Sequence, residues 1–206
     1  MNTYSSLKTS IAAWLSQSNI TANDSVVDDF LDMAEAETYR RLRCRFMEST
    51  GTLSTVAAQD YVALPSDFIA MRGVYRDGSP QSSLQYYTPE QINSVSNTSR
   101  APYAFTLRGD NMVFAGPADS VYSIKLHYYA KPTALSGSNT SNWLTTNYPQ
   151  VLLYGALKHA AIYISDDELL SKFSALYERA ISDLEAADAN DSFGPAPVML
   201  TEGAKW

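Results

Sequence analysis

Few side chains in this sequence have the type and spacing that acid–base, nucleophilic or metal chemistry requires. The two histidines, His127 and His159, each lack a second histidine or a cysteine at metal-ligand spacing. The single cysteine, Cys44, follows three arginines that would favour a reactive thiolate, but no neighbouring histidine or asparagine completes a nucleophile pair. We therefore predict structural roles for all three residues, in the core or at an interface.

Three consecutive carboxylates, Asp166, Asp167 and Glu168, form an acidic cluster that a metal or acid–base site could use. They follow Ser165, however, and Ser165 with Glu168 three residues later forms a capping box that begins a helix. Neither a phosphate-binding glycine loop nor a G-x-S-x-G nucleophile motif is present. The sequence thus predicts a protein that is not an enzyme and that needs no metal or other cofactor.

A run of arginines is the main local concentration of positive charge. Arg40, Arg41, Arg43 and Arg45 are four of the fifteen lysine and arginine residues. The protein nevertheless has a formal net charge of −7 and an isoelectric point near 4.7, which disfavours binding along a nucleic-acid backbone. The run suits the C-terminal end of a helix, where cations oppose the helix dipole. Its partners would be carboxylates of the same subunit or of a neighbouring one, where such pairs set orientation more than affinity.

The composition is that of a folded globular protein. Of its 206 residues, 45% are hydrophobic and 18% are charged, and the length suffices for one large domain or two small ones. One cysteine permits no internal disulfide, so a reducing compartment is expected. The sequence has no apolar run of about 20 residues and no basic-then-apolar leader. We therefore expect a cytosolic protein.

Helices are predicted at both ends of the chain. Apolar residues at helical spacing indicate one helix over residues 3–17 and a second over 23–43. Residues 147–187 have the pattern of two helices with no room for a loop between them, which predicts an αα-hairpin.

The first helix of this hairpin is the expected centre of the core. Asn147, with Gln150 three residues later, is its expected cap. Over residues 148–164 the helix is apolar on almost every side and is interrupted only by Lys158 and His159. Such a helix is normally buried on several sides.

Strands are predicted for the middle of the chain. Alternating residues and turn signals indicate antiparallel strands, among which Thr88 caps and Pro89 begins a short helix. The predicted fold class is α+β: a helix bundle, with two N-terminal helices plus the C-terminal αα-hairpin, and an inserted antiparallel β-sandwich or barrel. The predicted domains are a discontinuous helical bundle, an inserted β-domain and an extended C-terminal tail; their residues are 1–45 and 147–190, 46–146, and 191–206.

Six short stretches stand in a distinctive order and spacing, although none carries chemistry: Ala34–Arg43, Tyr61–Phe68, Leu84–Gln91, Leu126–Leu135, Asn142–Leu144 and Leu152–Leu157. Through them, residues 34–184 resemble the head–tail adaptor proteins of tailed bacteriophages. This connector family includes the tail tubular protein A type.

The resemblance implies a structural protein rather than an enzyme. Members of that family assemble as a ring, typically of twelve subunits, beneath the portal of a DNA-filled capsid, and tail components attach below. The helices would form the ring, and the β-domain would project outward or toward the tail. The expected partners are the portal protein, tail or nozzle proteins and further copies of the chain. DNA would pass through the lumen without specific binding, and no membrane would be involved. The expected location is the virion, at the portal–tail junction, after synthesis in the host bacterial cytoplasm.

The resemblance also implies two sets of contact residues. In such connectors an extended C-terminal segment often engages the portal, and the tail here combines apolar residues with helix-breaking glycine and proline. The candidate portal-binding residues are Phe193, Val198, Met199, Leu200 and Trp206. The candidate residues of an interface between subunits are Arg40, Arg41, Arg43, Arg45, Lys158 and His159.

A second interpretation is a different virion or tail component whose β-domain binds a receptor or a glycan. The aromatic-rich stretch over residues 122–129 is its basis, because aromatic side chains with polar tips are frequent in contact surfaces.

Overall fold

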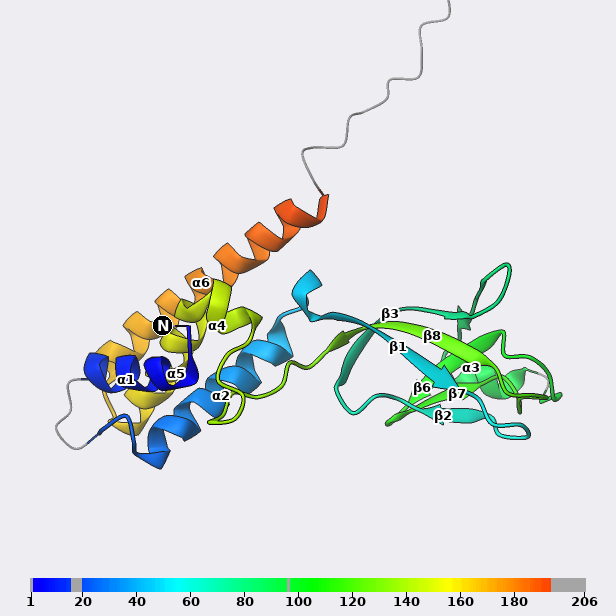
Figure 1. Ribbon diagram of the computed structural model, residues 1–206, viewed down its shortest axis with the longest axis horizontal. Helices are drawn as coiled ribbons and strands as arrows, with labels where there is room; N and C mark the ends of the chain where they lie inside the picture. The colour runs from blue at the N-terminus through cyan, green and yellow to red at the C-terminus, as the bar shows by residue number, and fades with distance from the viewer. Residues whose placement is uncertain (1, 16–19, 96, 194–206) are drawn as a thin grey trace, which may run out of the picture. The chain divides into compact units, whose positions relative to one another are not determined.

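The computed structural model describes residues 2–15, 20–95 and 97–193, with side chains given as far as residue 191 (Figure 1). The fold is α+β, as predicted. The chain divides into a helical unit, residues 1–46 and 132–206, and a strand unit, residues 47–131. Residues 132–146, which the sequence analysis counted with the strands, group with the helices. They do so because the amide of Leu135 donates a hydrogen bond to Glu35, and because the segment ends in a short helix of the helical unit.

The helical unit is built around one central helix. Its members are α1 (Tyr4–Leu15), α2 (Ser25–Arg41), α4 (Trp143–Asn147), α5 (Pro149–Tyr163) and α6 (Asp167–Phe193) (Figure 1). Helices α1, α2, α4 and α6 all pack against α5. The apolar character of α5 is therefore explained within the subunit. A neighbouring subunit is not needed to cover it, although Ile162 and Tyr163 at its end remain exposed.

Gly155 is the point of closest packing between α5 and its neighbours. A Cβ atom placed there would lie 3.0 Å from the Cβ of Ala34 in α2 and 3.3 Å from Cε2 of Tyr177 in α6. These distances are shorter than ordinary van der Waals contact between carbon atoms. Three helices can thus approach one another here because residue 155 has no side chain.

The cap predicted at Asn147 for the first helix of the hairpin is wrong, because α5 has no side-chain cap and the capping box is at the preceding helix, α4. The capping box belongs to α4, where Asn142 accepts a hydrogen bond from the amide of Thr145 and the Thr145 hydroxyl accepts one from the amide of Asn142. Asn147 instead donates its side-chain amide to the carbonyl of Trp143. Helix α5 follows almost at once, with Pro149 as its first residue.

The cap predicted at Ser165 is displaced by one residue. Asp166 is the side chain that accepts a hydrogen bond from the amide of Leu169, at 2.9 Å. Ser165 has a left-handed φ of 58° and ends α5. Its amide donates to Ile162, and the amide of Asp166 donates to Ala161, which is the Schellman pattern. The tight corner between α5 and α6 is made in this way.

Helix α6 is longer than predicted. The sequence analysis placed its end near residue 187 and assigned residues 191–206 to an extended tail, yet the helix continues to Phe193. Arg45 stabilises the added turns, because its guanidinium contacts Asp191 at 2.6 Å and its amide donates to Asp188. The carboxylates of Asp188 and Asp191 in these turns are therefore both paired with Arg45.

The strand unit contains two sheets of four strands. One has the order β1-β8-β3-β4 and the other β2-β7-β6-β5, and all neighbouring strands are antiparallel except β5 and β6. The strands are β1 (Glu48–Ser54), β2 (Tyr61–Ala63), β3 (Phe68–Arg76), β4 (Ser82–Ser83), β5 (Gln85–Tyr86), β6 (Ala104–Arg108), β7 (Asn111–Phe114) and β8 (Ser123–Ala130). A 3-10 turn, η1 (Arg45–Met47), precedes them, and α3 (Pro89–Ser94) is the short helix predicted to begin at Pro89.

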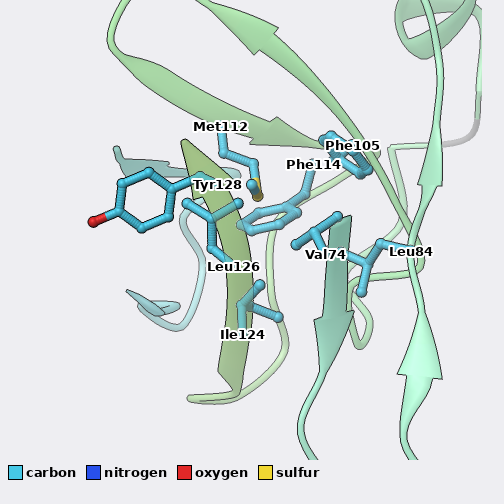
Figure 2. Packing of buried hydrophobic residues seen from close by; sticks show 8 residues of the cluster. All are labelled: Val74, Leu84, Phe105, Met112, Phe114, Ile124, Leu126 and Tyr128. Carbon is cyan, nitrogen blue, oxygen red and sulfur yellow. The ribbon is translucent and has the colours of Figure 1, made fainter. Parts of the chain in front are cut away.

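The larger of two hydrophobic clusters among the described residues of the strand unit lies between these two sheets. Figure 2 shows side chains of β3 and β8 meeting side chains of β6 and β7. The buried members of the cluster are Val74, Leu84, Phe105, Met112, Phe114, Ile124, Leu126 and Tyr128. The unit is therefore an open sandwich, and the described strands do not close into a barrel.

Candidate functional site

The arginine run at the end of α2 has several different partners. Arg41 forms an ion pair with Glu178 of α6, with Nη2 2.6 Å from Oε2. Arg43 donates to the carbonyl of Tyr39 at 3.1 Å and to that of Arg40 at 3.2 Å, so it caps the helix end. Among the described residues, the side chain of Arg40 donates only to the carbonyl of Ala36 in its own helix. The run therefore serves in part as contacts within the subunit.

Arg45 connects the segment that follows α2 to the far end of α6 within the helical unit. Besides its contacts with Asp188 and Asp191, its guanidinium lies 5.0 Å from the ring centre of Phe46. The Phe46 ring stacks on Trp143, with centroids 5.4 Å apart. Arg45 and Phe46 thus join three segments of the helical unit that are far apart in sequence.

Lys158 and His159, the polar interruption of α5, both contact Glu37 of α2. The Lys158 ammonium lies 2.5 Å from one carboxylate oxygen, and Nε2 of His159 lies 3.1 Å from the other. Burial alone would raise the pKa of Glu37, but the hydrogen bond and charge of Lys158 outweigh burial and hold that pKa below its ordinary value. Burial, followed by the charge of Lys158, lowers the pKa of His159 below its ordinary value.

The lowered pKa of His159 predicts a pH dependence of stability. The folded protein favours neutral His159, so its contribution is fully present above the unfolded pKa of about 6.5 and is lost as the pH falls through the folded pKa. We expect the urea midpoint to decline between pH 7 and pH 5 in the wild type, and to decline less in His159→Gln. Equal slopes in the wild type and His159→Gln would contradict this assignment.

A buried network in the helical unit was not found from the sequence. Glu35, only 4% exposed, accepts hydrogen bonds from the hydroxyl of Tyr39 at 3.1 Å and from the amide of Leu135 at 3.0 Å. The Tyr39 oxygen also accepts from the side-chain amide of Asn142 at 2.8 Å. Burial and the Glu35 charge raise the pKa of Tyr39 above its ordinary value. The sequence signal was Glu35 itself, an acidic residue on the apolar side of α2.

The remaining residues with possible chemistry have structural surroundings. His127 lies between two hydroxyls, with Thr50 at 2.9 Å and Tyr75 at 3.0 Å. Cys44 is buried, and Asp166 caps α6. In the described ranges, no three histidine, cysteine, aspartate or glutamate side chains are grouped so that they could hold a metal ion. None of the described helices has both the length and the apolar content to cross a membrane.

The side chains of the candidate portal-binding residues lie outside the described part of the chain. Val198, Met199, Leu200 and Trp206 lie outside the described residues. Phe193 is the last residue of α6, and its side chain also lies outside the described set.

In the described part of the chain, the residues that the sequence singled out for possible chemistry form helix caps, ion pairs and hydrogen bonds within the fold, or are buried. The family model described as SU10 adaptor protein matches residues 2–199, and the chain therefore belongs to this family of phage head–tail adaptors. Comparison with curated proteins gives no match. The protein is thus a structural bacteriophage component that associates with head and tail components in the virion.

Proposed function

We propose that this adaptor forms a ring beneath the portal, joins the capsid to the tail and leaves a channel for DNA. The observation that carries the proposal is the family match over residues 2–199. We further propose twelve subunits, the tail tubular protein A type, and the absence of any enzymatic activity. The portal, the tail or nozzle proteins and other copies of the chain are the proposed partners.

The charge of the protein supports a role as a DNA channel. Each copy contributes a formal charge of −7, so a ring of copies surrounds its lumen with negative potential. Acidic walls repel the phosphate backbone, and the DNA passes without specific binding. Cryo-electron microscopy of the protein mixed with its cognate portal is the direct test. We expect a closed ring at the portal, whereas portals without a ring would contradict the proposal.

The portal contact is assigned to the C-terminal segment, with Phe193, Val198, Met199, Leu200 and Trp206 as its apolar residues. Deletion of residues 194–206 should abolish docking to the portal and leave the melting temperature nearly unchanged, because the deletion spares Asp188 and Asp191 and their contacts with Arg45. Co-sedimentation with portals is the measurement. A full-length variant with Val198, Met199 and Leu200 changed to serine should show the same loss. Normal docking of the truncated protein would refute the assignment.

The proposed interface between ring neighbours contains Arg40, Arg41, Arg43, Arg45, Lys158 and His159. Because Arg41, Arg45 and Lys158 also have carboxylate partners within the subunit, such an interface would share or exchange those partners. The receptor- or glycan-binding alternative rests on the aromatic-rich stretch over residues 122–129, two of whose aromatic residues have contacts within the strand unit. Tyr128 is buried between the sheets, and the hydroxyl of Tyr122 donates a hydrogen bond to the carboxylate of Asp119.

A further inference from the structure

One side of α2 faces away from the helices that pack against it. Its exposed residues include Asp29, Met33, Ala36 and Arg40, and the side chain of Met33 is among the most exposed apolar ones of the helical unit, at 45%. At about 100° per residue, these four positions lie within roughly 60° of one another around the helix axis. They form a single outward stripe, which we call the α2 stripe.

Neither charge of the α2 stripe has an ion-pair partner among the described residues, and the same is true of Asp32, which is exposed on the same helix. Asp28, which lies off the stripe, pairs with Lys8, and Arg41 pairs with Glu178. Arg40, by contrast, contacts only the carbonyl of Ala36 through Nε, at 3.1 Å, and Asp29 has no cation within ion-pair distance in the described ranges. The stripe therefore presents an anion at one end and a cation at the other.

The order of residues in the stripe is symmetric about its centre. Asp29 and Arg40 are equally far from the midpoint between residues 34 and 35, and so are Met33 and Ala36. When two such stripes meet antiparallel about a two-fold axis, Asp29 of one copy faces Arg40 of the other. The long side chain of Met33 likewise faces the small Ala36. We propose that the α2 stripe binds the same stripe of a second copy in this antiparallel arrangement.

The chemistry of the stripe limits the strength of this contact. Two exposed ion pairs each contribute little binding free energy, and one methionine side chain over an alanine adds a small apolar area. The dimer is therefore weak, and its affinity falls as salt is added.

This contact is separate from the proposed ring. Neighbours in a cyclic ring use two different surfaces, whereas a two-fold contact uses the same surface on both copies. The α2 pairing thus occurs between copies that are not ring neighbours, such as adaptors in solution before assembly. Arg40 is a candidate for both contacts, whereas Asp29 is a candidate for the α2 pairing alone. The Asp29→Arg variant therefore distinguishes failure of the pairing from failure of the ring.

Charge reversal tests the pairing in the full-length protein. Arg40→Glu places Glu opposite Asp29 of the second copy, and Asp29→Arg places Arg opposite Arg40. Each is expected to raise the dimer dissociation constant at least tenfold by sedimentation equilibrium at low salt. The double variant Asp29→Arg with Arg40→Glu restores opposite charges at both positions and should return the constant to within about threefold of the wild type.

Arg179→Glu is the matched control, because Arg179 is an exposed residue of α6 without an ion-pair partner among the described side chains. It carries the same change of charge and should leave dimerisation unchanged. Circular dichroism and melting temperature must show that every variant is folded. A wild-type protein that stays monomeric at roughly 1 mM overturns the proposal. So does an Arg40→Glu protein that dimerises as well as the wild type, or a folded double variant that does not recover.

Discussion

Gly155→Val is expected to lower the free energy of unfolding of the helical unit by about 3 kcal/mol or more. The reason is the contact at the centre of the helices, where even a Cβ atom would lie 3.0 Å from the Cβ of Ala34. A Cβ is fixed by its backbone, so neither helix can relieve the overlap by changing a rotamer. Valine adds two methyl groups to this overlap. Urea unfolding followed by the helical circular dichroism signal is the measurement.

Combining Gly155→Ala with Ala34→Gly tests whether the contact between the Cβ atoms of residues 155 and 34 causes the loss of stability. Alanine has a higher helix propensity than glycine by about 1 kcal/mol, so Gly155→Ala would stabilise an isolated helix. Here it should destabilise, because its Cβ meets that of Ala34. In the background of Ala34→Gly the penalty should fall by about 1 kcal/mol, since the opposing Cβ is gone. Strict additivity of the two substitutions would mean that the close contact does not limit packing.

Glu35→Ala is expected to destabilise the helical unit by about 3 kcal/mol. The substitution leaves the amide of Leu135 and the hydroxyl of Tyr39 without their carboxylate acceptor, and the site is only 4% exposed. The Leu135 bond also ties the returning chain to α2 across a separation of 100 residues. We therefore expect a lower urea midpoint together with faster hydrogen exchange of the Leu135 amide.

Two milder variants separate the parts of this network. Tyr39→Phe removes one hydroxyl and should cost about 1 kcal/mol. Glu35→Gln keeps an acceptor oxygen for one donor, so its loss of stability should lie between those of Tyr39→Phe and Glu35→Ala. Glu185→Ala, at an exposed position of α6, is the control and should change stability by less than about 0.5 kcal/mol. A Glu35→Ala protein within that same range of the wild type would show that water replaces the carboxylate.

The sequence alone predicted the α+β class, the helical ends, the αα-hairpin and the short helix at Pro89, and the structure confirms these features. Each depends on periodicity or on local turn chemistry, which a single sequence displays. The central position of α5 could also be inferred, because a helix without a polar side must be covered. The identity of the covering helices could not, since α1, α2, α4 and α6 are distant in sequence.

The features that the sequence analysis placed wrongly or missed all depend on contacts between segments that are separate in the sequence. Asn142 and Asn147 both have the residue type of a cap, and packing of α4 against α5 decides which one is used. The extra turns of α6 depend on Arg45, which is more than 140 residues away in the chain. The Glu35 network likewise joins segments that no local pattern connects. Sequence reasoning thus identified the elements, but it missed the polar contacts that join them.

The first and last strands of the insertion are direct neighbours, because Glu48 of β1 is paired with Tyr129 of β8. Paired residues of antiparallel strands have Cα atoms only about 4.5–5.5 Å apart. The backbone therefore leaves the helices and returns to them at nearly the same point. Over evolutionary time such a segment can be lengthened, shortened or exchanged between related genes without moving a single helix. A phage lineage can in this way change the binding partners of the strand unit while keeping the helical unit constant.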